Sequence, residues 1–378
     1  MKKKIILIIL LLLVVTITGC STEETKKEKK KYIEDYSIEE SIFKDSYKKA
    51  SKLVTEMTIE EKIAQMFLVA YDKYYVNKYT DTPPAGYLLF AKDFQDHTKD
   101  SMKEELSTAN KKSKYPLIFA ADEEGGYVTR ISRFKEYRDE KFASPRTYYE
   151  EGGEALLKET EKEKAELLKS IGVNLNLAPV ADVSTDENDF INNRTFNRNA
   201  KETSELIKKM VEYANEFKIN SCLKHFPGYG NNEDTHTGVA IDNRDYQTLK
   251  ENDYLPFIAG IEAKVPSILV SHNVVNSIDS EYPASLSVKV IYELRNNLNF
   301  TGIIMTDDLA MDAVKSYVQD GQAATLAINA GNDLLITSDF DTMYKEVLNS
   351  YKDGEISEDT INKAVLRIIA WKYESNLF

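Results

Sequence analysis

Cysteine is scarce in this chain: Cys20 and Cys222 are the only two among its 378 residues. Small secreted domains rely on several disulfides, and two cysteines cannot supply such a framework. The fold must therefore depend on a hydrophobic core, for which a hydrophobic content of 42% is sufficient. Glycine (15 residues) and proline (9 residues) are too few for a collagen-like or wholly disordered protein.

Positive charge is also in short supply, with 49 Lys and Arg against 62 Asp and Glu and a formal net charge of −13. Nucleic-acid binding needs a basic surface, so we expect no nucleic-acid partner. No glycine-rich Walker loop occurs, and no His-x-His pair occurs in the first apolar run. The sequence therefore favours neither a phosphate-cradling site nor a catalytic metal, and we expect no metal and no cofactor.

No apolar run is long enough for a permanent transmembrane helix; the N-terminal run spans residues 5–15. Lys2, Lys3 and Lys4 precede it, which is typical of a secretory signal. The segment Ile17-Thr18-Gly19-Cys20 resembles a bacterial lipobox, which implies a signal peptide over residues 1–19 and a lipid on Cys20. The alternative is a plain signal peptide with an incidental cysteine.

Residues 20–35 are charged and nearly devoid of apolar side chains, which predicts a flexible tether behind the lipidated cysteine. We therefore expect the protein to be anchored on the outer face of the bacterial cytoplasmic membrane. Residues 36–378 would form one catalytic domain. Cys222 lies in an apolar run and is expected to be an inert core residue.

Eight short apolar runs of the kind that form buried parallel strands follow the tether. They are Gln65–Ala70, Gly86–Phe90, Leu117–Ala121, Val173–Leu177, Ser221–His225, Ser267–Ser271, Gly302–Thr306 and Asp333–Thr337. Amphipathic helical patterns separate them. One pattern, around Leu206 and Met210, has Thr203 or Ser204 as its expected cap, and the last pattern follows Ser357. Eight alternations predict an α/β fold, a (β/α)8 TIM-type barrel, with a doubly wound open sheet as the alternative.

Polar residues follow or end the predicted strands, at the barrel face where active sites form. They are Asp122 after the third strand, Asp182 after the fourth, Lys224 and His225 in the fifth, His272 after the sixth, and Asp307 and Asp308 after the seventh. Each has an ordinary explanation, such as a helix cap or a buried hydrogen bond. Their convergence on one face instead indicates a binding site for a small polar ligand.

Four ordered motifs carry a family resemblance. They are Asp122-Glu123-Glu124-Gly125-Gly126 with Arg130, Asn193-Arg194-Thr195-Phe196, the segment from Lys224-His225-Phe226-Pro227-Gly228 to Asp234-Thr235-His236, and Thr306-Asp307-Asp308. Together they resemble glycoside hydrolase family 3, in its single-domain β-N-acetylhexosaminidase branch, over roughly residues 55 to 371. The chain departs from the usual Pro-Gly-His-Gly turn at Tyr229, and its loop is one residue shorter before Asp234.

The resemblance implies a role for each matching position. Asp307 corresponds to the nucleophile, which would form a covalent glycosyl-enzyme, and adjacency makes Asp308 its rival. His236 corresponds to the acid/base and Asp234 to the residue that orients it, and Gly228 and Gly230 would let their loop close over the sugar. The positions that would hold the sugar hydroxyl groups are Asp122, Arg130, Arg194, Lys224 and His225.

The resemblance thus implies an exo-acting retaining β-N-acetylglucosaminidase that removes terminal GlcNAc from peptidoglycan fragments or related glycans. We expect no second domain that would supply a glutamate acid/base, and we expect a monomer. Two alternatives stay open: a phosphorylase that uses phosphate in place of water, and a non-catalytic, lipid-anchored glycan-binding protein.

Overall fold

The computed structural model describes residues 41–378 apart from 233–239 and 319–320. Eight parallel strands form its central sheet, in the order β11-β9-β7-β6-β3-β2-β1-β12. Their bounds are β1 (Phe67–Ala70), β2 (Gly86–Leu89), β3 (Ile118–Ala121), β6 (Leu175–Asn176), β7 (Asn220–Phe226), β9 (Ser267–Val270), β11 (Ile303–Thr306) and β12 (Leu335–Thr337). Each lies in or overlaps one of the eight predicted runs.

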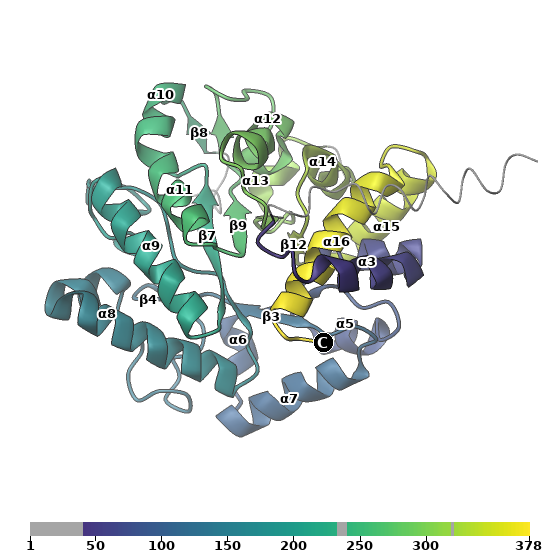
Figure 1. The fold of residues 1–378 in the computed structure, drawn as a ribbon, viewed down its shortest axis with the longest axis horizontal. Helices are drawn as coiled ribbons and strands as arrows, with labels where there is room; N and C mark the ends of the chain where they lie inside the picture. Colours follow the sequence, from purple (N-terminus) through teal and green to yellow (C-terminus); the bar gives the residue numbers. More distant parts are fainter. Residues whose placement is uncertain (1–40, 233–239, 319–320) are drawn as a thin grey trace, which may run out of the picture. The chain divides into compact units, whose positions relative to one another are not determined.

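The two end strands of this sheet meet, so the sheet curls into a barrel. A parallel bridge joins Met305 to Leu334, and the Thr306 amide donates to the Leu334 carbonyl over 3.1 Å. In Figure 1 the helices lie outside the strands. The predicted (β/α)8 barrel is confirmed, and the open doubly wound sheet is wrong.

The helices that alternate with the strands have the following bounds. They are α3 (Tyr47–Glu56), α4 (Ile59–Ala64), α5 (Lys73–Lys78), α6 (Ala91–Phe94), α7 (Lys99–Lys112), α8 (Pro145–Ser170), α9 (Ala200–Glu216), α10 (Tyr246–Thr248), α11 (Tyr254–Glu262), α12 (Val288–Tyr292), α13 (Asp312–Lys315), α14 (Ala323–Ala330), α15 (Phe340–Lys352) and α16 (Glu358–Glu374). None of the helices in the described ranges is long and apolar enough to cross a bilayer.

The start of the last helix was predicted correctly, and the cap of α9 was predicted wrongly. The hydroxyl of Ser357 accepts the Thr360 amide over 3.0 Å, so α16 begins where its pattern indicated. For α9 the prediction of Thr203 or Ser204 is wrong, because the cap is Asn199, which accepts the Glu202 amide over 3.0 Å. The hydroxyl of Ser204 instead donates to the carbonyl one turn earlier, at Ala200.

Four short strands lie outside the barrel and shape its loops. β4 (Glu123–Gly125) and β5 (Val128–Thr129) form a hairpin directly after β3. β8 (Ile241–Asp242) pairs in parallel with β10 (Val274–Val275), which joins the loop after β7 to the loop after β9. In the barrel wall Cys222 is fully buried, and burial raises the pKa of its thiol to about 12, as suits an inert core residue.

Candidate active site

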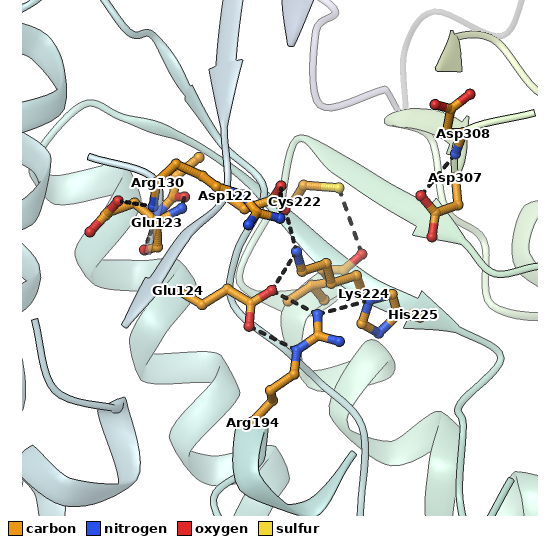
Figure 2. A network of polar contacts seen from close by, with 12 residues as sticks. Asp122, Glu123, Glu124, Arg130, Arg194, Cys222, Lys224, His225, Asp307 and Asp308 are labelled. Atoms are coloured by element: carbon orange, nitrogen blue, oxygen red, sulfur yellow. Dashed lines mark hydrogen bonds and ion pairs between the residues drawn. The ribbon is translucent and has the colours of Figure 1, made fainter. Parts of the chain in front are cut away.

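The candidate site lies where the barrel strands end at their carboxyl edge. We use the name mouth cluster for five residues there: Asp122, Glu124, Arg194, Lys224 and His225 (Figure 2). Asp122 directly follows β3, Glu124 lies in β4, and Lys224 and His225 occupy the last part of β7. Arg194 ends a short 3-10 turn, Asn192–Arg194, in the loop after β6. The barrel topology thus brings together side chains from three separate stretches of the chain.

Lys224 is the positive centre of the mouth cluster. Its side chain is nearly fully buried, and its ammonium group lies 2.7 Å from Asp122 Oδ1 and 2.6 Å from Glu124 Oε1. Burial alone would lower the pKa of Lys224, but the two carboxylates outweigh that effect and raise it. Lys224 is therefore held as a cation. Of its two carboxylate partners, Asp122 is more exposed than Glu124.

Glu124 is the negative centre and was not singled out from the sequence. Arg194 binds it in a bidentate pair, with Nε 3.0 Å from Oε2 and Nη2 2.8 Å from Oε1. Burial by itself would raise the pKa of Glu124, but Lys224 and Arg194 hold it well below its ordinary range. The sequence did contain one signal for Glu124. It lies two positions after Asp122, and residues two apart in an extended segment point to the same face.

His225 is fixed as a neutral imidazole. Its Nδ1 lies 2.8 Å from Asp182 Oδ2, and its Nε2 lies 3.2 Å from Arg194 Nη2. Arg194 can only donate, so Nε2 accepts and Nδ1 carries the proton that is donated to Asp182. Burial lowers the pKa of His225 and, with smaller contributions from the nearby Arg194 and Lys224, outweighs the opposite effect of Asp182. Asp182, which follows β6 in the chain, thus orients the imidazole of His225 in the mouth cluster.

Arg130 borders the mouth cluster from the β4–β5 hairpin. Its Nη2 lies 3.5 Å from Asp122 Oδ2, and its guanidinium carbon lies 5.9 Å from the centre of the Phe90 ring. Glu123 holds the hairpin in place by accepting the amides of Arg130 (2.9 Å) and Ile131 (2.8 Å). The Nε of Arg130 is buried and has no hydrogen-bond partner within the described part of the chain.

Asp307 and Asp308 follow β11 and point in different directions. The carboxylate of Asp308 accepts the amides of Ala310 (2.9 Å) and Ser338 (3.2 Å), so it stabilises the loop. Figure 2 shows the carboxylate of Asp307 turned away from that of Asp308, on the side of Lys224 and His225. The backbone of Asp307 is fixed by its amide, which donates to the Val270 carbonyl over 3.1 Å. The geometry therefore favours Asp307 over Asp308 as the residue directed at a ligand.

His272 supports the same loop and does not belong to the mouth cluster. It is fully buried, its Nε2 donates to the carbonyl of Asp308 over 3.0 Å, and its Nδ1 lies 2.7 Å from the hydroxyl of Ser285. The side chain thereby joins the end of β9 to the segment after β11. His272 was predicted to lie on the rim of the site. In the structure it supports the segment that carries Asp307 and Asp308.

The predicted dyad of Asp234 and His236 lies outside the described residues. The chain that leads into it is described: the Tyr229 amide donates to Asp182 Oδ1 over 2.7 Å. The ring of Tyr229 stacks edge-on against His225, with centroids 4.9 Å apart. Tyr229, which departs from the family pattern, therefore packs behind His225 as a buried aromatic side chain.

The arrangement suits recognition of a neutral, hydroxyl-rich ligand. Ionised donors and acceptors of both signs surround the mouth, and they are held by one another before any ligand arrives. The charges largely offset one another, so the site does not favour a highly charged ligand. Within the described ranges, no three His, Cys, Asp or Glu side chains are grouped so as to hold a metal ion.

Known proteins are similar to this chain over most of its length. A family model described as the glycosyl hydrolase family 3 N terminal domain matches residues 58–371. The chain is 27% identical over 315 residues to "Beta-hexosaminidase A" of Pseudoalteromonas piscicida, which covers 76% of this chain but 53% of that protein. It is 30% identical over 267 residues to a "Beta-hexosaminidase" of Nitrosomonas eutropha, covering 68% of this chain and 74% of the relative.

Among solved structures, a family 3 β-N-acetylglucosaminidase from Paenibacillus sp. str. FPU-7 is similar, with a TM-score of 0.78. The likeness covers 85% of this chain and 63% of that chain at 22% identity, which supports the shared barrel fold. The chain thus spans about half the length of the Pseudoalteromonas relative and less than two thirds of the Paenibacillus structure.

Proposed function

The chain belongs to glycosyl hydrolase family 3, a family of glycoside hydrolases, and from that premise we propose that it is an exo-acting retaining β-N-acetylglucosaminidase. Its substrate would be a terminal β-linked GlcNAc on peptidoglycan fragments or related glycans. The observation that carries the proposal is the gathering of Asp307 and the mouth cluster at one end of the barrel. The relatives named β-hexosaminidase support the choice of an N-acetylated sugar.

The proposed reaction has two steps. In the first, a carboxylate oxygen of Asp307 attacks the anomeric carbon, the glycosidic bond breaks, and His236 gives a proton to the leaving oxygen. In the second, His236 takes a proton from water, water attacks the anomeric carbon, and the bond to Asp307 breaks. Asp234 would orient His236. Asp122, Arg130, Arg194 and Lys224 would hold the hydroxyl groups of the sugar through charge-assisted hydrogen bonds, and His225 would contact them as a neutral imidazole.

The proposal is tested by release of p-nitrophenol from its β-N-acetylglucosaminide, with and without added phosphate. We expect release that does not depend on phosphate, and a much slower reaction with the matching β-glucoside. Release that requires phosphate and yields the sugar 1-phosphate would instead establish a phosphorylase. If neither glycoside is cleaved and glycan fragments nevertheless bind, the chain is a binding protein.

We also propose that Cys20 carries a lipid that anchors the protein on the outer face of the cytoplasmic membrane. The support lies in the sequence: three lysines, an apolar run over residues 5–15 and the lipobox-like Ile17-Thr18-Gly19-Cys20. In a bacterial host, labelled palmitate should enter the wild-type protein and be absent from Cys20→Ser. A Cys222→Ser variant is the matched control and should keep the label. Equal labelling of wild type and Cys20→Ser would contradict the anchor.

A further inference from the structure

A second group of buried charges lies beside the mouth, in the loop after β7. We use the name Arg244 cluster for Arg244, Asp242 and Asp253. Asp242 ends β8, and Asp253 ends a π-helical turn, Leu249–Asp253, that leads into α11. Both carboxylates are almost completely buried, and the side chain of Arg244 is 21% exposed. No residue of this cluster belongs to the mouth cluster or to the predicted dyad.

Arg244 uses both edges of its guanidinium group. Its Nη2 lies 2.6 Å from Asp242 Oδ2 and its Nε lies 3.0 Å from Asp242 Oδ1. Its Nη1 lies 2.9 Å from each carboxylate oxygen of Asp253. The planar group with its five donors therefore bridges two carboxylates, a geometry that the single ammonium of lysine cannot reproduce.

The chain before the predicted dyad is packed directly on this cluster. The carbonyl of Gly228 accepts from Arg244 Nη2 over 3.4 Å. A Cβ at Gly228 would lie 2.4 Å from Asp253 Oδ1, and a Cβ at Gly230 would lie 2.2 Å from the Arg244 guanidinium. Both glycines have positive φ, +121° and +54°. In the structure both glycines approach the Arg244 cluster too closely for a side chain, which is a reason for glycine besides the loop freedom expected from the sequence.

The chain after the predicted dyad is held at the same place. Asp242 is itself a member of the cluster, and its strand β8 pairs with β10 at Val275. The carbonyl of Ala240 accepts the Val274 amide over 2.9 Å. Arg244 therefore contacts Gly228 on one side of residues 233–239 and Asp242 on the other. In the sequence, Asp234 and His236 stand between these two anchored points.

We propose that Arg244 is a positioning residue for the acid/base step: it holds Gly228 and Asp242, which flank in sequence the segment that carries Asp234 and His236. The inference rests on the proposed function, because it assigns Arg244 a role in that reaction. A small displacement of a general acid weakens proton transfer to the leaving oxygen, while the sugar site is built by other residues. The role of Arg244 is therefore separable from sugar binding.

The test compares two substrates that differ in their need for a proton. The 2,4-dinitrophenyl β-N-acetylglucosaminide has a leaving group that departs without protonation, whereas the phenyl glycoside requires a general acid. For Arg244→Lys, which keeps the charge but cannot bridge both carboxylates, we expect kcat/KM on the phenyl glycoside to fall roughly 10- to 100-fold. On the dinitrophenyl glycoside we expect kcat/KM to stay near the wild-type value.

Asp253→Asn is a second, milder variant, since it keeps the pair between Arg244 and Asp242 and a similar shape. Like Arg244→Lys, it should lower kcat/KM for the phenyl glycoside and leave kcat/KM for the dinitrophenyl glycoside near the wild-type value. The matched control is Arg367→Lys, at the opposite end of the barrel, where Arg367 Nη1 lies 2.7 Å from Asp333 Oδ1. This control should leave the ratio of the two kcat/KM values unchanged even if it lowers the melting temperature.

The outcomes separate the inference from the proposed function. Equal losses on both substrates, or full activity of Arg244→Lys on the phenyl glycoside, would overturn the positioning role and leave the proposed function intact. Failure of the wild-type enzyme to cleave either glycoside would overturn the proposed function and the inference with it.

Discussion

Replacing Asp307 with asparagine is expected to lower kcat on the p-nitrophenyl β-N-acetylglucosaminide by roughly 10⁴- to 10⁶-fold, as for other nucleophiles that act in a coupled unit. The amide has nearly the same shape but cannot attack the anomeric carbon or stabilise positive charge that develops there. The melting temperature should change little, since Asp307 lies at the mouth and is held through its backbone amide.

The neighbouring Asp308 provides the matched control. An asparagine there retains the oxygen that accepts the Ala310 and Ser338 amides. Asp308→Asn should therefore keep most of the wild-type kcat. Burial raises the pKa of Asp308, so loss of its charge is tolerable in the folded protein. If Asp308→Asn were the inactive variant and Asp307→Asn the active one, the assignment of the nucleophile would be wrong.

Replacing Lys224 with methionine should damage both stability and catalysis. The change leaves Asp122 and Glu124 without their shared cation, and breaking such a buried pair costs about 3–5 kcal/mol of unfolding free energy. We expect kcat/KM to fall roughly 10- to 100-fold as well, because charge-assisted hydrogen bonds to the sugar are lost and Asp122 is no longer oriented. Urea denaturation and steady-state kinetics on the same preparation measure the two effects.

Lys372→Met is the control for Lys224→Met, because it removes a buried lysine that lies outside the site. Lys372 is fully buried at the amino ends of the strands, where it donates to Gln65 Oε1 (2.7 Å) and the Pro116 carbonyl (2.6 Å). Its removal alters stability far from the mouth and should leave kcat/KM at the wild-type value. An equal kinetic loss in the Lys372 and Lys224 variants would mean that Lys224 acts through folding alone.

The barrel could be predicted from the sequence because its strands are buried on both faces. Such strands read as continuous apolar runs, and all eight runs are observed as strands. The position of the site followed from the same pattern, since parallel strands end at one face and polar residues stood at those ends. Asp182, Lys224 and His225 are close together in space for that reason, although Asp182 is more than forty residues from the other two.

Other features depend on three-dimensional contacts that leave little trace in a single sequence. Glu124 became the centre of the mouth cluster because Arg194 reaches it from a loop 70 residues away. Arg244 matters because its guanidinium group meets the carboxylates of Asp242 and Asp253, two and nine residues away, and the sequence does not indicate that the three side chains fold onto one another. The α9 cap was misplaced because Asn199, Thr203 and Ser204 are all good capping residues and only the local path selects Asn199.

The central claim, a covalent intermediate on Asp307, is tested most directly by trapping it. A fluorinated N-acetylglucosaminyl donor whose second step is slow should form the glycosyl-enzyme, which digestion and mass spectrometry can locate. We predict a single added sugar on the peptide that contains Asp307, with fragment ions that place it on Asp307 and none on Asp308. An active enzyme that turns over the donor without any labelled peptide, or that carries the label on another residue, would contradict the proposed mechanism.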